Sequence, residues 1–295
     1  MTDTAPSALP AAGLVLAGVS ALSLSVVTTA ARLAYDGGMD PQTLVAARAA
    51  VGFACAVAIA LALRQRPRFA AADAGVLLGM SIGQLMINFG YMISVLYIPV
   101  SLAALIFYIF PVLVLVIDAA LGRRMPPAPV VAAFIAAFGG LALALTPSFE
   151  TLDARGLAAA LVATLGGTLL MLFGSRAARR VGTISTFFYM QCIAACVTVS
   201  VMMGLGGPTL PVTDTGWLAL AVACTGYVIG VGTQVVAVKR VDPAPASLVY
   251  NLEPLGTLAI AALVLAERLA PMQYLGGALV LGAIIYASRY WTRQL

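Results

Sequence analysis

The sequence predicts an all-α, polytopic membrane protein in which ten transmembrane helices form two inverted five-helix repeats around a central cavity. The first observation is composition. Of the 295 residues, 62% are hydrophobic and 9% are charged, whereas soluble domains are about half apolar and about a quarter charged. The second is a series of ten apolar runs, each long enough to cross a bilayer. The third is an internal repeat, in which one constant shift along the chain places the first five runs on the last five.

The charge and the reactive side chains exclude several classes of function. The basic residues behind the net charge of +5 lie in short loops and not in a patch with aromatic residues, so we expect no nucleic-acid partner. The chain has no histidine, and its four cysteines lie inside apolar runs, which is typical of packing residues. We therefore expect neither a metal nor another cofactor. No basic segment precedes the first run, so we expect it to remain as an uncleaved helix.

An apolar run of about 20 residues crosses the hydrocarbon core of a bilayer. The predicted spans cover residues 11–31, 42–63, 74–97, 101–121, 128–146, 156–175, 183–205, 215–237, 244–265 and 271–291. The connections between them are short, and none is long enough to hold a soluble domain. Any function must therefore reside in the packed spans themselves.

The distribution of Lys and Arg predicts the orientation of the chain. With the N-terminus in the cytoplasm, twelve of these residues fall in inside segments, three fall in outside segments and Arg48 lies within a span, which accounts for all 16. Cytoplasmic loops of membrane proteins carry an excess of Lys and Arg. We therefore expect both termini in the cytoplasm, in the inner membrane of a bacterium.

Two prolines define the internal repeat. Pro111 and Pro254 each interrupt an apolar run at the same place, and the shift in residue number from one to the other is called here the repeat shift. It places a first repeat, residues 1–147, on a second repeat, residues 148–295. Because each repeat has five spans, an odd number, the two must cross the membrane in opposite directions. Inverted repeats are typical of secondary transporters, whose substrate sites lie between the repeats near the midplane.

A polar stripe lies on the third and eighth spans. Gln84, Asn88 and Tyr91 share one helical face because they follow one another at i, i+4 and i+7. The repeat shift places Gln84 on Tyr227 and Tyr91 on Gln234, so both repeats carry the same pair in exchanged order. Amides and phenols need partners in hydrocarbon, which indicates a polar cavity between the repeats. The alternative is hydrogen bonding between closely packed helices.

The two prolines are predicted to kink the fourth and ninth spans. A proline inside a helix leaves a backbone carbonyl without its usual partner. Tyr108 and its repeat equivalent Asn251, together with Tyr250, lie one turn before Pro111 or Pro254. This position suits a contact with a ligand or ion, and the alternative is a kink that only shapes packing.

Glu253 is the candidate charged group of the site. It follows Pro243, at the start of the ninth span, by ten residues, which places it about 15 Å deep and near the midplane. A carboxylate there can bind a substrate ammonium group or carry a proton. The alternative is a buried ion pair with Arg48, which lies inside the second span.

Glycines spaced four residues apart occur on the same two spans as the polar stripe. They are Gly75, Gly79 and Gly83 on the third span, and Gly226 and Gly230 on the eighth. Small residues at this spacing allow two helices to approach closely. We expect close helix contacts along both spans.

Three stretches resemble the EamA family of the drug/metabolite transporter superfamily. They are PQTLVAARAAVG at 41–52, FPVLVLVIDAALG at 110–122 and LEPLGTLAIAALVLAERLAPMQYLGGALVLGAI at 252–284. The resemblance covers essentially the whole chain. The family signature at the end of the ninth span and in the tenth corresponds here to Pro254, Glu267, Gly276 and Gly277. The first repeat departs from it, because Arg124 stands where the second repeat has Glu267.

The resemblance implies a bacterial inner-membrane transporter, often an exporter of amino acids, and is greatest to YddG-type exporters. It also implies a substrate cavity formed mainly by spans 1, 3, 4, 6, 8 and 9. In this hypothesis Tyr91, Tyr108, Tyr227 and Tyr250 stack on the solute or hydrogen-bond it, and Gln84, Asn88, Gln234 and Asn251 bond its polar ends. The alternative within transport is an importer or exchanger of cationic, quaternary-amine or nucleotide-like solutes, because aromatic faces attract cations.

A membrane enzyme or a scaffold is a more remote alternative. The sequence has no histidine, nucleotide-binding loop or paired carboxylates at catalytic spacing, so we do not expect an enzyme. The expected partners are a small-molecule substrate and the lipid bilayer, and the working expectation for the assembly is a monomer.

Overall fold

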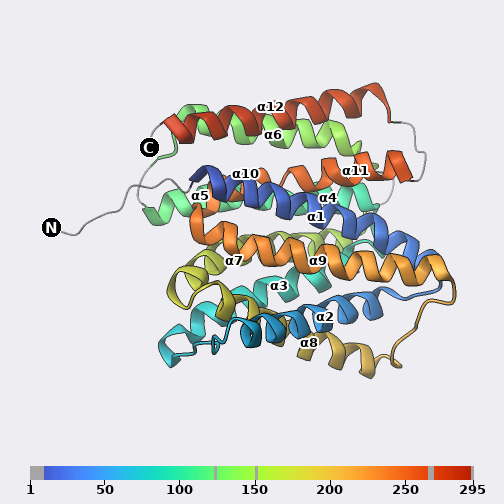
Figure 1. The fold of residues 1–295 in the computed structure, drawn as a ribbon. Coiled ribbons are helices and arrows are strands. Elements are labelled where there is room, and N and C mark those ends of the chain that lie inside the picture. The colour runs from blue at the N-terminus through green and yellow to red at the C-terminus, as the bar shows by residue number, and fades with distance from the viewer. Residues whose placement is uncertain (1–9, 123–124, 150–151, 265–268, 294–295) are drawn as a thin grey trace.

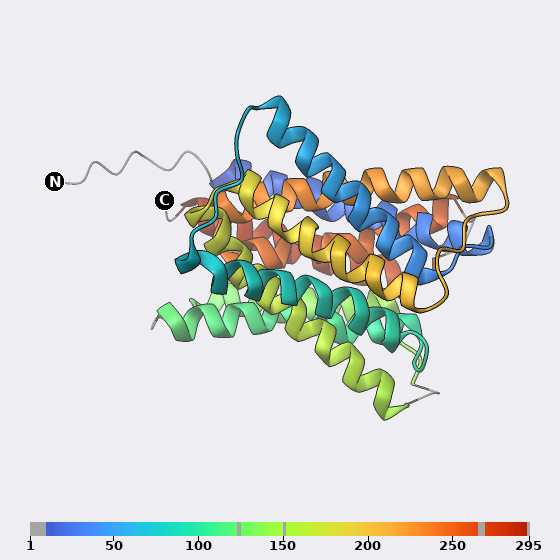
Figure 2. The same cartoon turned by 90° about the horizontal axis from the view of Figure 1, so that it is seen from below.

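The fold is a bundle of helices that run along one common direction (Figures 1 and 2). A computed structural model describes residues 10–122, 125–149, 152–264 and 269–293. Within these ranges ten helical segments are long and apolar enough to cross a membrane, which confirms the ten predicted spans. The helices are α1 (Pro10–Asp36), α2 (Pro41–Ala62), α3 (Ala74–Ser94), α4 (Val100–Phe107), α5 (Phe110–Gly122), α6 (Ala128–Leu145), α7 (Ala154–Arg180), α8 (Thr183–Gly204), α9 (Asp214–Arg240), α10 (Pro243–Val249), α11 (Leu252–Val264) and α12 (Pro271–Arg293), with one short 3₁₀ turn at Ala71–Asp73.

Two of the spans are broken into half-helices. The fourth span consists of α4 and α5, separated at residues 108–109, and the ninth consists of α10 and α11, separated at residues 250–251. Each break lies just before a proline, Pro111 or Pro254, because a proline has no amide hydrogen to continue the ladder. The predicted kinks are therefore present, and each is a full interruption of the helix.

The packing of the helices has a pseudo-twofold pattern. In the first repeat, α3 packs along α7 of the second repeat, and α9 of the second repeat packs along α1 of the first. The repeat shift converts one of these pairs into the other. The remaining pairs, α2 with α8 and α6 with α12, join equivalent helices of the two repeats. The chain is thus two five-helix repeats of opposite orientation.

The pairs lie in layers. Figure 1 shows α6 and α12 at one edge, α2 and α8 at the opposite edge, and the remaining helices between them. Both termini lie at the same end of the bundle in both views, as an even number of spans requires. The broken helices lie in the middle layers and not on either edge.

Small residues allow the crossing helices to touch backbone to backbone. A Cβ atom on Gly83 of α3 would lie 2.7 Å from the Gly166 carbonyl oxygen of α7, and one on Gly226 would lie 3.0 Å from the Ser23 carbonyl oxygen of α1. Gly83 and Gly226 are equivalent in the two repeats, and so are Ser23 and Gly166. The expected close contacts are confirmed there, whereas Gly75 faces open space.

A substitution at Gly83 tests this packing. Gly83→Ala should force α3 away from α7 and lower the free energy of unfolding by about 1–3 kcal/mol. Gly75→Ala is the matched control, because nothing lies within 4 Å of the added methyl group. Thermal unfolding of the purified proteins in detergent measures the difference. A melting temperature for Gly83→Ala equal to that of the control would contradict the contact.

Candidate functional site: a polar cluster between the repeats

Polar side chains from both repeats meet in the middle layers of the bundle. We call this group the central polar cluster. It consists of Ser20, Arg48, Gln84, Asn88, Tyr91, Tyr108, Gln191, Tyr227, Gln234, Tyr250, Asn251 and Glu253. It includes the ten predicted polar and charged site residues, of which Asn251 is present only as the chain neighbour of Tyr250 and bonds its own backbone. Ser20 and Gln191 are additions made by the structure.

Most of the cluster is buried in this structure. Seven of its predicted members, Gln84, Asn88, Tyr108, Tyr227, Gln234, Tyr250 and Asn251, are at most 7% exposed. Arg48, Tyr91 and Glu253 are half-buried. Several of these side chains hydrogen-bond with one another.

Arg48 organises one side of the cluster. Its Nη2 donates to Asn88 Oδ1 at 3.1 Å, and its guanidinium carbon lies 5.1 Å from the centre of the Tyr227 ring. Gln84 Nε2 also donates to Asn88 Oδ1, at 3.4 Å. An arginine stacked on an aromatic ring and bonded to an amide is held in one orientation. Arg48 is therefore a fixed positive charge next to the predicted stripe.

Gln191 of α8 extends this side of the cluster. The Tyr227 hydroxyl donates to Gln191 Oε1 at 3.3 Å, and the Gln191 side chain is fully buried. The sequence analysis missed Gln191, although a signal was present, because the repeat shift places Arg48 on Gln191. The second and seventh spans thus contribute to a site expected mainly from other spans.

Tyr250 joins three helices at the break between α10 and α11. Its hydroxyl donates to Ser20 Oγ at 3.0 Å, and Ser20 donates in turn to the Gly230 carbonyl oxygen at 2.6 Å. The Gln234 side chain also lies close to the Tyr250 hydroxyl. The ninth span is therefore fixed to α1 and α9 by side chains at its broken point.

Glu253 lies in the first turn of α11, where the positive end of the helix dipole favours a negative charge. The Tyr108 hydroxyl, at the other broken span, lies close to its carboxyl group. Tyr91 and Tyr250 also lie within its electrostatic range. Glu253 thus lies near three tyrosines.

Arg48 and Glu253 do not form a direct ion pair. Each is within electrostatic range of the other, yet among the described residues no ion pair within 4.0 Å involves either of them. The buried pair that the sequence offered as an alternative is therefore two separated charges in one cluster.

The remaining side chains at the breaks have local partners. The Asn251 side-chain nitrogen donates to the Leu248 carbonyl oxygen at 2.9 Å, so this amide bonds the chain at the break. Around the other break, the Phe107 ring contacts those of Tyr91, Tyr108 and Phe110 at centre distances of 5.9, 5.0 and 5.1 Å. The first-repeat break is thus aromatic, and the second-repeat break is mainly polar.

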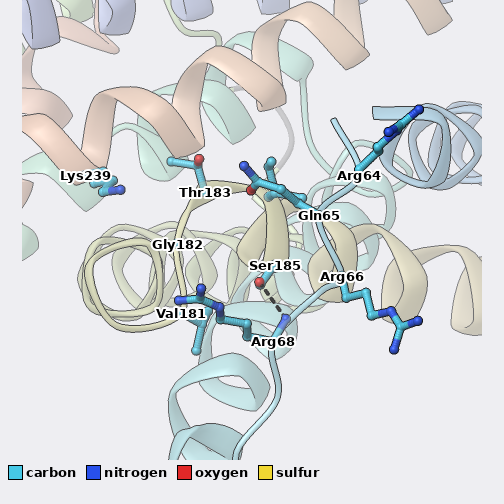
Figure 3. Close-up of a pocket in the computed structure, with 10 residues that line it drawn as sticks. Arg64, Gln65, Arg66, Arg68, Val181, Gly182, Thr183, Ser185 and Lys239 are labelled. Carbon is cyan, nitrogen blue, oxygen red and sulfur yellow. Dashed lines mark hydrogen bonds between the residues drawn. The ribbon is translucent and has the colours of Figure 1, made fainter. Parts of the chain in front are cut away.

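A separate pocket of about 710 Å³ opens at the end of the bundle that holds both termini. Residues 64–68 (apart from Pro67), 181–185 and Lys239 line it, and none of the predicted site residues does. The Arg68 amide donates to Ser185 Oγ at 2.9 Å, which ties the α2–α3 loop to the start of α8 (Figure 3). The pocket is basic and is distinct from the central polar cluster.

Comparison with known proteins gives the family. The sequence model of the EamA-like transporter family matches residues 11–146 and 154–289. The chain belongs to this family. The family is one of membrane transporters, and it matches once on each five-helix repeat, which confirms the resemblance noted in the sequence.

The fold is also that of a solved protein. A structure titled only as a crystal structure of a protein superposes with a TM-score of 0.81, covering 94% of this chain and 97% of the other, at 20% identity. At this identity the likeness shows the fold alone. A comparison with curated proteins finds no match. Of the family signature, Glu267 and its counterpart Arg124 lie outside the described residues.

The contact between Tyr227 and Gln191 provides a test of the cluster. Tyr227→Phe should leave the buried Gln191 oxygen without a donor and lower the free energy of unfolding by about 1–3 kcal/mol. Replacing both partners, as Tyr227→Phe with Gln191→Leu, should recover most of this loss, because no unpaired polar group then remains. Unfolding of the single and double variants in detergent gives the comparison. An additive loss in the double variant would exclude the contact.

Proposed function

We propose that this EamA-like transporter is a secondary transporter that exports small metabolites, most specifically amino acids, by alternating access. One observation carries the proposal: a carboxylate, Glu253, lies near three tyrosines, Tyr91, Tyr108 and Tyr250, at the broken helices between the two repeats. A carboxylate within the membrane is costly and is usually part of a substrate or ion pathway.

The architecture supports alternating access. Secondary transporters with inverted repeats place the substrate at discontinuous helices near the midplane and move one repeat against the other. Both discontinuous spans of this chain contribute to the central polar cluster, through Tyr108 in one and Tyr250, Asn251 and Glu253 in the other. The cluster is held by side-chain hydrogen bonds, which a solute with equivalent groups can replace.

The charges favour an amino acid over the alternative solutes. Glu253 and the tyrosine rings suit an ammonium group. Arg48 lies in the same cluster and would repel a solute whose only charge is positive. A zwitterion satisfies both charges, so an amino acid fits the cluster better than a quaternary amine does.

Counterflow in proteoliposomes tests this function. Vesicles loaded with a pool of unlabelled amino acids should accumulate a radiolabelled member of the pool. Glu253→Gln should reduce this exchange about ten-fold or more, because a charge-assisted hydrogen bond is worth about 1.5–3 kcal/mol.

Asp118→Asn is the matched control. Asp118 is another half-buried acid within a span, but it lies outside the central polar cluster. Exchange by Glu253→Gln at the control level would overturn the role of Glu253. Failure of the wild-type protein to exchange any amino acid would overturn the proposed substrate class.

We place the protein in a bacterial inner membrane with both termini in the cytoplasm. The excess of Lys and Arg at the end that carries the basic pocket supports this orientation (Figure 3). A green fluorescent protein fused after the C-terminus should fluoresce, and alkaline phosphatase at the same point should be inactive. Fusions at Leu210, in the α8–α9 connection at the opposite end, should give the reverse pattern. An active phosphatase at the C-terminus would refute the orientation.

A further inference from the structure

We infer that Arg48 and Asn88 form a subsite for the carboxylate of the transported amino acid, separated from the ammonium subsite at Glu253. This inference rests on the proposed function and deepens it. It assigns the two ends of the solute to different repeats, Arg48 and Asn88 to the first and Glu253 to the second.

Vacant hydrogen-bond donors carry the inference. Among the described residues only four buried side-chain polar atoms have no hydrogen-bond partner, and three of them belong to Arg48, Asn88 and Gln191. They are Arg48 Nε, Asn88 Nδ2 and Gln191 Nε2, and all three are donors. Buried polar groups in native proteins are nearly always bonded, so a vacant group needs an explanation. A ligand oxygen provides one for the Arg48 and Asn88 donors, whereas the Gln191 nitrogen packs against Gly52.

The two donors of the subsite are neighbours. The 3.1 Å hydrogen bond from Arg48 Nη2 to Asn88 Oδ1 holds the guanidinium beside the amide. Asn88 Oδ1 also accepts a hydrogen bond from Gln84 Nε2. The Asn88 oxygen therefore has two donors, and the Asn88 nitrogen remains available to a ligand. Asn88 is only 5% exposed. A carboxylate has two oxygens that accept a pair of adjacent donors, and charge-assisted bonds to Arg are among the strongest in proteins.

Charge balance points to the same ligand. Arg48 is half-buried and takes part in no ion pair within 4.0 Å among the described residues. An unpaired charge away from water is costly, and an anionic ligand would remove that cost. Glu253 is near enough to interact but too far for contact. The gap between the two charges suits a solute that carries one charge of each sign.

Gln191 is a positioning residue for this subsite. Its nitrogen packs against Gly52, one turn after Arg48 on α2, and a Cβ at Gly52 would overlap it. The Gln191 oxygen accepts a hydrogen bond from the Tyr227 hydroxyl, and the Tyr227 ring lies against the Arg48 guanidinium. The absence of a side chain at Gly52 thus leaves room for Gln191. Gln191 in turn positions the Tyr227 ring, and this ring orients Arg48.

The experiment separates the two ends of the solute. Phenylalanine, leucine and lysine would compete for counterflow against their decarboxylated amines, phenethylamine, isoamylamine and cadaverine. The wild-type protein should prefer at least one amino acid over its amine by about ten-fold or more. Asn88→Asp keeps the size of the side chain but places a carboxylate beside Arg48. It should weaken amino-acid competition about ten-fold or more and leave amine competition unchanged or stronger.

Two further variants complete the design. Arg48→Gln should also lose the preference for amino acids over their amines, and competition by the amines should stay unchanged. Thr29→Ala is the matched control, because Thr29 Oγ1 is the fourth buried atom without a partner but lies outside the subsite, and it should behave as wild type. If Arg48→Gln does not fold, Asn88→Asp still tests the subsite. The aspartate keeps an oxygen that accepts the hydrogen bond from Arg48, so we expect this variant to fold.

The outcomes distinguish the two proposals. Wild-type amino-acid preference in both Asn88→Asp and Arg48→Gln would overturn the carboxylate subsite and leave amino-acid transport standing. A wild-type protein that exchanges no amino acid would overturn the proposed function. Stabilisation of the purified protein against heat by 3-phenylpropanoate then decides the subsite. If this stabilisation depends on Arg48, the subsite is retained as a carboxylate site. If 3-phenylpropanoate does not stabilise the protein in this way, the carboxylate subsite is overturned together with the proposed function.

Discussion

The choice of hydrogen-bond partners among polar side chains inside the helix bundle is the constraint on which this structure depends. In hydrocarbon, a backbone or side-chain polar group without a partner costs several kcal/mol. The breaks at residues 108–109 and 250–251 leave the ladder incomplete, and tyrosine, amide and hydroxyl side chains gather at the same level of the bundle. The bonds from Tyr250 to Ser20 and from Asn251 to Leu248 secure the second break. The buried donors at Arg48 and Asn88 are the exception, because they have no hydrogen-bond partner.

The inverted repeat explains why this polar region lies at the centre. Because α3 packs along α7 and α9 along α1, each stripe-bearing helix crosses a helix of the other repeat. The crossings at Gly83 and at Gly226 occupy equivalent positions, so the same close approach is made twice. Both stripes therefore meet the partner repeat and stay away from lipid. The edge pairs, α2 with α8 and α6 with α12, close the bundle on either side (Figure 1).

The side chains break the symmetry that the backbone keeps. The first repeat contributes the cation Arg48, whose equivalent is the neutral Gln191, and the second contributes the anion Glu253, whose equivalent is the apolar Phe110. The two charges are separated and not paired. A symmetric scaffold with opposite charges in its two halves can hold a dipolar solute in one orientation. In the proposed alternating-access cycle, movement of one repeat relative to the other would change the distance between the two charges.

The sequence by itself determined the ten spans, the repeat, the positions of both breaks and the polar stripe at Gln84 and Asn88. These features are local, because hydropathy, proline chemistry and helical periodicity act within one segment. Only the tertiary structure decided that Arg48 bonds Asn88 and not Glu253, that Gln191 and Ser20 join the cluster, and that Asn251 bonds its own backbone. The reason is physical. Each long polar side chain has several candidate partners, and the crossing of helices far apart in sequence selects among them.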